Sequence, residues 1–410
     1  MKKKNVTIIV KAVLFLALLI CVTVFVGKIL QRKDEYIRYK QFYSEKENFD
    51  VLFFGSSRAL DCFQPMELWE DYGITSYNLA QHSEILGKNY WSMYNAFKYN
   101  TPKVAVVDIS TFGGSTSVSS ESSESDRAYM HNTLDHMPLS REKIEAVNAL
   151  CSKDLRLEYL FPLILYHSRW NDLGNSDFYG NEPARKGAET RTTLAPAEFV
   201  PWPTDDLAEI FDPSSVNLDK IIALCKERNV QLICVCLPAP EGTYYTTMNS
   251  FSQYLEDNDV PFINLWDKED IINYATDFAD ASHVNNSGSK KLTSVIGEYL
   301  STNYSFSDKS DKEKASWNEA LQRYKGSKTY EVVTGSADIT STLLRIMSDD
   351  DFKAEIVYKD KETIEAMGIS ELLKEMEGYS DIYEDFTLQC NVSLTVYFEG
   401  NEEPLVSQQY

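Results

Sequence analysis

The chain has 410 residues, and its 43% hydrophobic content is enough to build sizeable cores, which excludes a disordered tail. Residues 1–33 carry seven Lys and Arg and no Asp or Glu, so the remaining 33 basic and 62 acidic residues give the rest of the chain a net charge of −29. Because that negative charge repels nucleic acid and anionic lipid, we expect no nucleic-acid partner. A well-solvated surface explains the excess of acidic residues. A neutral or cationic partner would also be compatible with this charge.

The N-terminus predicts a membrane-spanning helix. An apolar stretch runs from Val6 to Leu30, interrupted by Lys11 and Lys28, whose long side chains can reach the two membrane interfaces. A cleaved signal peptide is the alternative, but no small-residue cleavage site follows the apolar core. The basic tail favours a cytoplasmic N-terminus, although basic residues also flank the outer side. We therefore expect a single-pass protein of the cell membrane, extracytoplasmic after about residue 34.

Strand and helix patterns alternate from residue 49 to residue 300, which is typical of a parallel sheet covered by helices on both faces. The sequence therefore predicts a three-layer α/β domain. The strands are expected at 50–54, 76–80, 103–109, 231–237 and 261–266, and the helices at 66–72, 86–99, 218–228, 248–256 and 286–300.

A long insert interrupts this alternation at about residues 113–212. Its first part, 113–125, is rich in Ser, Gly and Glu and is expected to be a mobile loop. Helices are expected near 141–150 and 155–166, followed by an irregular segment. Because long irregular stretches in compact domains are usually functional, we expect the insert to form a lid or binding loop.

A charged linker at 305–314 predicts a domain boundary. Beyond it, strands are expected near 329–333 and 352–358, a helix at 362–377 and a hairpin-like pair around 386–398, which together predict a small α+β domain. This domain offers no nucleophile with an obvious base, so binding or structural support is expected of it. The expected domains are a cytoplasmic tail and membrane helix at 1–33, an α/β domain at 34–304 and an accessory domain at 305–410.

A candidate nucleophile follows the first predicted strand, where Gly55 precedes Ser56 and Ser57. Sites of open α/β sheets form outside the carboxyl ends of the strands. Gly55 permits a tight turn there, and the start of a following helix would offer N–H groups to an oxyanion. A serine becomes nucleophilic only when a base takes its proton, and most Gly-Ser-Ser strings are plain loops, so the assignment depends on a base elsewhere.

That base is expected between the last strand and the last helix of the α/β domain. Asp280 and His283 are three residues apart, so the carboxylate can hold one imidazole nitrogen while the other faces the serine. We predict Ser57 as nucleophile, His283 as base and Asp280 as its orienting acid; helix capping by Asp280 is the alternative. The seven cysteines show no metal-ligand spacing, so neither a metal nor a cofactor is expected.

These two blocks resemble the SGNH (GDSL-like) hydrolase superfamily. Phe53-Phe54-Gly55-Ser56-Ser57 matches its first block and Asp280-Ala281-Ser282-His283 its last, over about residues 48–302. The resemblance implies a flavodoxin-like αβα fold, with Ser57 as nucleophile and Ser56 in support. The chain looks most similar to a membrane-anchored branch that includes the D-alanyl-lipoteichoic acid transfer proteins and the alginate-type O-acetylation proteins. The ending common in that branch is similar to His283-Val284-Asn285 followed by Gly288 and a lysine in this chain.

The middle blocks depart from the superfamily pattern. Where it often has a glycine that donates to the oxyanion, this chain has Asn78 and Ala80; the Ala80 N–H could serve, with Asn78 nearby. Where many members have Gly-x-Asn-Asp, this chain has Val107-Asp108-Ile109-Ser110, so the usual Asn donor is missing. This departure favours a specialised transferase over a generic esterase.

Other polar residues could contact a substrate. Arg58 could hold an anionic group, or it could pair with a carboxylate of the acidic domain. His167 and Arg169 could line a site for a glycan or a phosphate-bearing substrate, although packing at a helix end is equally common. His82 could face the cleft or lie on the surface. Two further histidines are expected in surface loops: His131 and His136.

The resemblance implies acyl transfer at the outer membrane face. An acyl-Ser57 intermediate would pass its acyl group to a hydroxyl of a cell-envelope polysaccharide or teichoic acid, and a membrane-bound O-acyltransferase would be the donor partner. Hydrolysis, such as glycan deacetylation, is the first alternative because it uses the same motifs. A non-catalytic scaffold of an envelope acylation complex is the second, and the retention of Ser57, Asp280 and His283 speaks against it.

Overall fold

A computed structural model describes the chain as two compact units. The first unit holds residues 1–45 and 119–182, and the second holds residues 46–118 and 183–410. Most of the loop expected at 113–125 lies outside the described residues. The described residues are 2–31, 34–111, 121, 123–179, 185–199, 201–210, 212–240, 245–266, 268, 270–334 and 338–410.

The second unit is built on a five-stranded parallel sheet with the order β2-β1-β3-β4-β5. This confirms the predicted parallel α/β architecture, and the order is that of flavodoxin-like folds. Every residue of β1 and β3 is buried, because helices cover both faces of these central strands. The strands are β1 Val51–Phe54, β2 Ser76–Asn78, β3 Val104–Asp108, β4 Gln231–Cys236 and β5 Phe262–Asn264.

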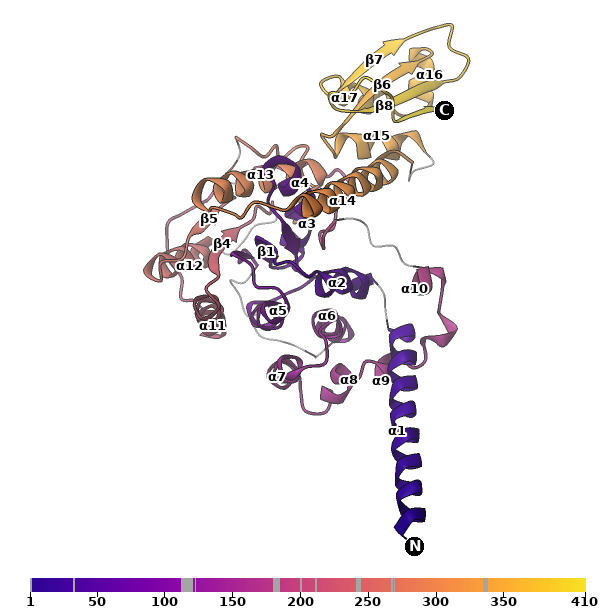
Figure 1. Ribbon diagram of the computed structural model, residues 1–410. Coiled ribbons are helices and arrows are strands. Elements are labelled where there is room, and N and C mark those ends of the chain that lie inside the picture. Colours follow the sequence, from indigo (N-terminus) through magenta and orange to yellow (C-terminus); the bar gives the residue numbers. More distant parts are fainter. Residues whose placement is uncertain are drawn as a thin grey trace. The chain divides into compact units, whose positions relative to one another are not determined.

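Helices form the two outer layers of this sheet (Figure 1). On one face lie α3 Ser57–Cys62, α4 Pro65–Tyr72 and α13 Asn286–Asn303, and on the other lie α5 Leu86–Tyr99 and α11 Asp212–Arg228. A further helix of this domain, α12 Tyr245–Asp257, packs beside β5. The helices expected from the apolar pattern are therefore confirmed, with ends that differ by a few residues.

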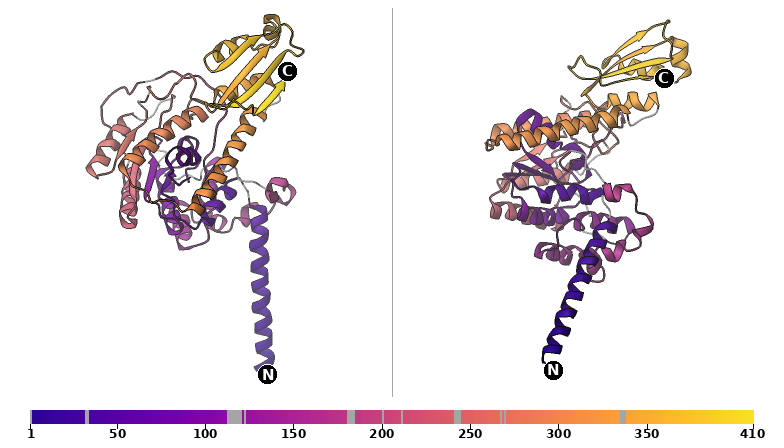
Figure 2. Two further views of the ribbon diagram at one scale, coloured as in Figure 1. Left: turned by 45° about the horizontal axis from the view of Figure 1, so that its top comes forward. Right: turned by 45° about the vertical axis from the view of Figure 1, so that its right-hand side comes forward.

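The C-terminal part forms a mixed sheet of order β7-β6-β8-β9, which confirms the small α+β domain. Its helices lie on one face of the sheet (Figure 2), and alternate residues of β6 and β8 are buried there. Its elements are α15 Ile339–Met347, β6 Phe352–Tyr358, α16 Lys361–Ala366, α17 Ser370–Met376, β7 Ser380–Glu384, β8 Val392–Phe398 and β9 Val406–Gln409.

Three predictions for this region were wrong. The strand expected at 329–333 is the end of a helix, α14 Asp311–Thr329, followed by a π-helical turn, Tyr330–Thr334. The helix expected at 362–377 is two helices, because Gly368 takes a left-handed φ of 71° between them. The hairpin expected around 386–398 does not form: β8 pairs with β6 and β9, and β7 runs parallel to β6.

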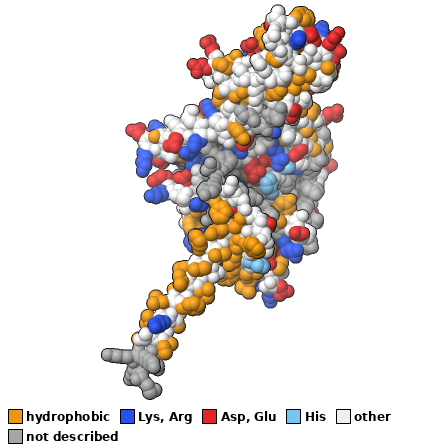
Figure 3. Space-filling view, turned by 90° about the vertical axis from the view of Figure 1, so that its right-hand side faces the viewer, with side chains coloured by type: hydrophobic (Ala, Val, Ile, Leu, Met, Phe, Trp, Pro, Cys, Tyr) orange, Lys and Arg blue, Asp and Glu red, His pale blue; other side chains and the backbone are white. Residues whose placement is uncertain are grey.

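The first unit contains a long apolar helix, α1 Lys2–Leu30. Its segment Val6–Leu30 is long and apolar enough to cross a membrane, as is a signal sequence near an N-terminus. Figure 3 shows hydrophobic side chains along its surface. The remaining helices of this unit are α2 Asp34–Ser44, α6 Glu124–Leu134, α7 Arg141–Leu150, α8 Arg156–Leu160, α9 Leu163–Tyr166 and α10 Asn175–Tyr179.

The insert helices correct several expectations. The helix at 141–150 is confirmed as α7, but the helix expected at 155–166 is split into α8 and α9 at Pro162. His131 and His136 were expected in surface loops and are buried instead. His131 lies in α6 between the carboxylates of Asp135 and Glu158, at 3.0 and 3.1 Å, and His136 stacks on Tyr39.

A buried lysine connects the C-terminal domain to the rest of the second unit. Lys328 of α14 is 2% exposed and contacts carboxylates of α4 and of the segment before β6: Glu67, Asp349 and Asp351. Burial alone would lower the pKa of Lys328, but these carboxylates raise it well above its ordinary value. The Lys328 ammonium group therefore stays charged between the α/β domain and the C-terminal domain.

Replacing this lysine should weaken folding far more than replacing an exposed neighbour. Lys328→Ala removes the buried cation that Glu67 and Asp349 face, while Asp351 keeps Lys290, and should lower the free energy of unfolding by about 3–5 kcal/mol. Lys325→Ala, on the same helix, loses an ion pair with Glu70 whose lysine is 34% exposed, and should lower it by less than about 1 kcal/mol. Urea denaturation measures both variants, and equal losses would contradict the role of Lys328.

Candidate active site

The nucleophile turn joins β1 to α3. Gly55, the residue after β1, has a φ of 150°, and a Cβ there would lie 2.7 Å from the Cβ of Ala59 and 2.8 Å from that of Asp108. Only glycine fits this close approach of the turn to β3. Ser57 is then the first residue of α3, and its side chain is partly exposed at the carboxyl end of the sheet.

Three side chains meet at this point. Nε2 of His283 lies 2.8 Å from Oγ of Ser57, and Nδ1 of His283 lies 2.8 and 3.0 Å from the two carboxylate oxygens of Asp280. The structure thus brings together the predicted nucleophile, base and acid in the order that serine catalysis requires.

Asp280 is held as a carboxylate. The N–H groups of Ser282 and His283 donate to its Oδ1 at 2.8 and 2.9 Å. Burial alone would raise its pKa, but the Ser282 and His283 hydrogen bonds and the charges of His283 and Arg191 lower the pKa of Asp280 below its ordinary value. A carboxylate that stays ionised can fix the imidazole tautomer and stabilise an imidazolium.

The loop that carries His283 is fixed by the residues after it. Asn285 caps α13 by accepting from the Gly288 N–H at 3.2 Å, and its amide donates to the Thr276 carbonyl at 2.7 Å. Lys291 pairs with the fully buried Asp277 at 2.9 Å. The His-Val-Asn-x-x-Gly spacing noted in the sequence therefore has a structural reason, because each polar residue ties the loop to the start of α13.

Arg191 is a site residue that the sequence did not indicate. Its Nε donates to Oδ2 of Asp61, a buried residue of α3, and its Nη1 lies 3.6 Å from Oδ2 of Asp280. Burial raises the pKa of Asp61, and the Arg191 charge and hydrogen bond oppose that rise. Arg191 thus links the helix that carries Ser57 to the carboxylate that orients His283. It lies in an irregular segment with no pattern that could have identified it.

The segment around Arg191 runs along the edge of the sheet. Gly187, with a φ of 89°, contacts β2 so closely that a Cβ would lie 2.1 Å from the Asn78 carbonyl oxygen. The Asn78 N–H donates to the Lys186 carbonyl at 2.9 Å, and the Glu189 N–H donates to the Leu60 carbonyl at 3.2 Å. This part of the insert therefore packs directly against β2 and α3, beside the nucleophile turn.

The two predicted oxyanion residues have other hydrogen-bond partners, which corrects that expectation. The Asn78 amide donates to the carbonyls of Ala59 and Phe63 at 2.8 and 2.9 Å, while its Oδ1 accepts from the Ala80 N–H at 3.0 Å. Asn78 and Ala80 therefore brace α3 and the turn after β2. Among the described residues, the first N–H groups of α3, that of Ser57 included, have no intrahelical acceptor and point to the start of the helix, where an oxyanion could accept from them.

Arg58 lies near a carboxylate of its own domain. Its Nη1 is buried with no hydrogen-bond partner among the described residues, and its charge acts on Asp108, which is fully buried. Burial raises the pKa of Asp108, while hydrogen bonds from Ser110 and the Arg58 charge partly offset the rise. No ion pair or hydrogen bond joins Arg58 to Asp108 among the described residues, so carboxylate pairing and substrate binding both stay predictions for Arg58.

The predicted substrate residues of the insert have structural contacts in the first unit. Arg169 donates to the Leu30 carbonyl at 2.6 Å and pairs with Asp177 at 3.1 Å, and Nδ1 of His167 lies 2.8 Å from the Ile164 carbonyl. Arg169 thus caps the end of α1, which corrects its expected role. His82 belongs to the second unit, where its Nε2 lies 3.3 Å from a carboxylate oxygen of Glu189.

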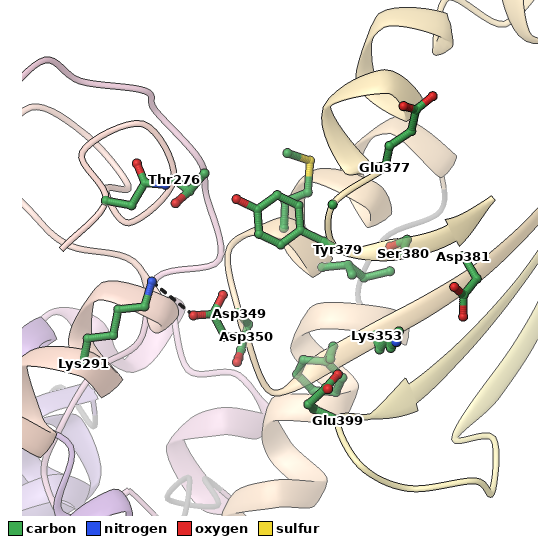
Figure 4. Close-up of a pocket in the computed structure, with 15 residues that line it drawn as sticks. Thr276, Lys291, Asp349, Asp350, Lys353, Glu377, Tyr379, Ser380, Asp381 and Glu399 are labelled. Atoms are coloured by element: carbon green, nitrogen blue, oxygen red, sulfur yellow. Dashed lines mark ion pairs between the residues drawn. The ribbon is translucent and has the colours of Figure 1, made fainter. Parts of the chain in front are cut away.

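A cavity of about 400 Å³ lies between the start of α13 and the C-terminal sheet. Figure 4 shows the ion pair between Lys291 and Asp350 at this cavity, with the Tyr379 ring directed toward it. The same region holds hydrogen bonds from Asn286 to Asp349 and from Ser287 to Asp350, at 2.8 and 2.9 Å. The C-terminal domain therefore contacts the helix that begins three residues after His283.

Comparison with known proteins gives a limited result. No family model matches the chain, and no curated protein matches it. Among solved structures, it is similar to a GDSL-like lipase from Bacteroides thetaiotaomicron, at 9% identity and a TM-score of 0.33, over 66% of this chain and 98% of that one. It is also similar to the psychrotrophic esterase EstA from Pseudoalteromonas sp., at 12% identity and a TM-score of 0.27, over 62% and 96%. TM-scores this low do not bear on function.

Removing the Arg191 charge should destabilise the site through Asp61. Arg191→Gln leaves a buried carboxylate unpaired, and the free energy of unfolding should fall by about 1–3 kcal/mol. Adding Asp61→Asn should recover part of that loss. Because a raised carboxyl pKa in the folded state weakens folding as the pH increases, the loss should shrink at acidic pH, where Asp61 is protonated.

Urea denaturation at several pH values measures these effects. The matched control is Arg323→Gln, which breaks an exposed i,i+4 pair with Glu319 and should change stability by less than about 1 kcal/mol. Strictly additive effects of Arg191→Gln and Asp61→Asn would show that the two side chains are not coupled.

Proposed function

We propose that this protein is a serine-dependent ester hydrolase or O-acyltransferase of the SGNH type. The observation that carries the proposal is the continuous contact from Ser57 through His283 to Asp280, with the 2.8 Å approach of Nε2 to Oγ. A hydroxyl, an imidazole and an ionised carboxylate in this order are the groups that nucleophilic acyl transfer requires. An intact set of this kind speaks against a purely structural scaffold.

The first half of the reaction forms an acyl-enzyme. Oγ of Ser57 attacks the carbonyl carbon of an ester or thioester donor, and Nε2 of His283 takes the hydroxyl proton. The Asp280 carboxylate stabilises the resulting imidazolium, and the Ser57 N–H at the start of α3 donates to the oxyanion. The tetrahedral intermediate then expels the alcohol or thiol, which takes the proton from His283, and leaves the acyl group on Ser57.

The second half returns the enzyme to its starting state. An acceptor hydroxyl loses its proton to His283 and attacks the acyl-Ser57 carbonyl, and Ser57 leaves with that proton. With water as acceptor the reaction is hydrolysis, and with a sugar or polyol hydroxyl it is O-acyl transfer.

The proposed setting is the outer face of the cell membrane. The apolar segment Val6–Leu30 supports a single-pass anchor, and the basic N-terminal tail supports a cytoplasmic N-terminus with an extracytoplasmic catalytic domain. An anchored acyltransferase fits a polymer assembled at the membrane, so the proposed acceptor is a cell-envelope polysaccharide or teichoic acid. A membrane-bound O-acyltransferase is the proposed donor partner, since acyl groups must first cross the bilayer.

Labelling with a fluorophosphonate tests the nucleophile. The full-length protein should react at Ser57, because the probe traps a serine that a neighbouring base activates. Ser57→Ala should abolish the labelling, whereas Ser56→Ala, which changes the adjacent serine, should keep it. In-gel fluorescence measures both, and labelling that persists in Ser57→Ala would remove Ser57 from the mechanism.

Turnover distinguishes transfer from hydrolysis. With p-nitrophenyl acetate, a transferase should release a burst of nitrophenol, retain acetyl on Ser57 and accelerate when a polysaccharide acceptor is added. Asp280→Asn should lower the burst rate by roughly 10³-fold or more, because the imidazole loses its orientation. Mass spectrometry of the acylated peptide and nitrophenol absorbance measure these outcomes. Steady turnover that acceptor does not change would favour the hydrolase alternative.

A further inference from the structure

The end of α1 lies against apolar parts of the insert, since α1 contacts α9 and α10. Residues 159–166, which include the end of α8 and all of α9, read Tyr-Leu-Phe-Pro-Leu-Ile-Leu-Tyr without a charged side chain. In a water-soluble region such a run would be buried. Here Phe161 and Ile164 are 51% and 50% exposed, and Trp170, just beyond α9, is 68% exposed.

We call the exposed apolar side chains of this region the apolar shelf. They project from short helices and the turns that connect them, and they lie in the same compact unit as α1. Large apolar side chains exposed on neighbouring short helices of one unit point to an interaction site, because proteins seldom gather such side chains in water. The members of the apolar shelf are Leu157, Phe161, Ile164, Leu165, Trp170 and Phe178.

Two contacts set the position of the apolar shelf along α1. A Cβ on Gly27 would lie 3.6 Å from the Cβ of Leu163, so α9 packs against the last turn of α1. One turn further on, Arg169 donates to the Leu30 carbonyl at 2.6 Å, which satisfies an acceptor that the helix end leaves open. The insert is thus fixed to the end of the apolar helix by packing and by a charged hydrogen bond.

This position coincides with the edge of a bilayer. Leu18 is the middle residue of Val6–Leu30, and Gly27 lies nine residues further, or roughly 14 Å along the axis at 1.5 Å per residue. The hydrocarbon half-thickness of a bilayer is about 15 Å. Side chains packed at the level of Gly27 therefore lie at the boundary between acyl chains and headgroups.

From this register we infer that the apolar shelf is seated in the bilayer interface beside α1, as a second membrane contact of the chain. Apolar residues of interfacial helices enter about 5–10 Å into this boundary, and tryptophan is enriched at the headgroup level. The Arg169 guanidinium would lie at the same level, near lipid phosphates. The inference rests on the proposed membrane span and not on the catalytic proposal.

Tryptophan quenching in lipid vesicles tests this inference. The full-length protein is reconstituted into phosphatidylcholine vesicles with dibrominated acyl chains, which quench tryptophan at the membrane boundary. Resistance of the reconstituted protein to alkaline extraction reports separately whether α1 spans the bilayer. The Trp170→Phe variant should lose a large part of the bromolipid-quenched emission.

A second variant adds a new tryptophan to the Trp170→Phe protein. In this background, Phe161→Trp should restore quenching by the brominated lipid. Lys374→Trp, in α17 of the C-terminal domain where the lysine side chain is 65% exposed, should be quenched by iodide from the water instead. If iodide alone quenches the tryptophan introduced by Phe161→Trp, the apolar shelf lies in water. If neither iodide nor the brominated lipid quenches this tryptophan, protein covers the apolar shelf. Either result overturns the inference.

Discussion

The catalytic proposal depends on a single hydrogen bond between side chains 226 residues apart, that between Ser57 and His283. An imidazole can serve a serine only if its other nitrogen is held, and Asp280 holds it through a carboxylate that itself accepts two backbone N–H groups. The tight turn at Gly55, after β1, determines where Ser57 lies at the end of the sheet. A small displacement of either loop would separate Oγ of Ser57 from Nε2 of His283, and hydrogen bonds to buried polar groups hold both loops in place.

Buried charges connect the parts of the second unit. The hydrophobic core of the α/β domain and that of the C-terminal domain are separate clusters. Between them, Lys328 joins carboxylates of both domains. Just after the loop that carries His283, Asn286 and Ser287 donate to Asp349 and Asp350. Such pairs require correct geometry to offset their desolvation, so they fix one relative arrangement more strictly than apolar contacts would.

The sequence indicated the sheet and the meeting of Ser57, His283 and Asp280 because both leave strong local patterns. Buried parallel strands appear as continuous apolar runs, and Ser57 and His283 follow strands whose carboxyl ends meet at one edge. The α14 helix was not predicted, because its many charged residues resemble those of a linker. Four of its residues nevertheless have helical spacing and are buried: Trp317, Ala320, Leu321 and Tyr324.

Other features left no local pattern in the sequence. Two valines at 332 and 333 suggested a strand, but packing against α15 places them in a π-helical turn. Arg191 acts through contacts that only folding creates, and His131 is buried because two acids from different helical segments pair with it.

The close packing of Gly187 on β2 also protects the sheet. An outermost strand exposes N–H and C=O groups that can template addition of a strand from another molecule. The Asn78 N–H of β2 is instead occupied by the Lys186 carbonyl, and β5, at the opposite margin, is three residues long. Both margins therefore offer few backbone groups to a strand of another molecule.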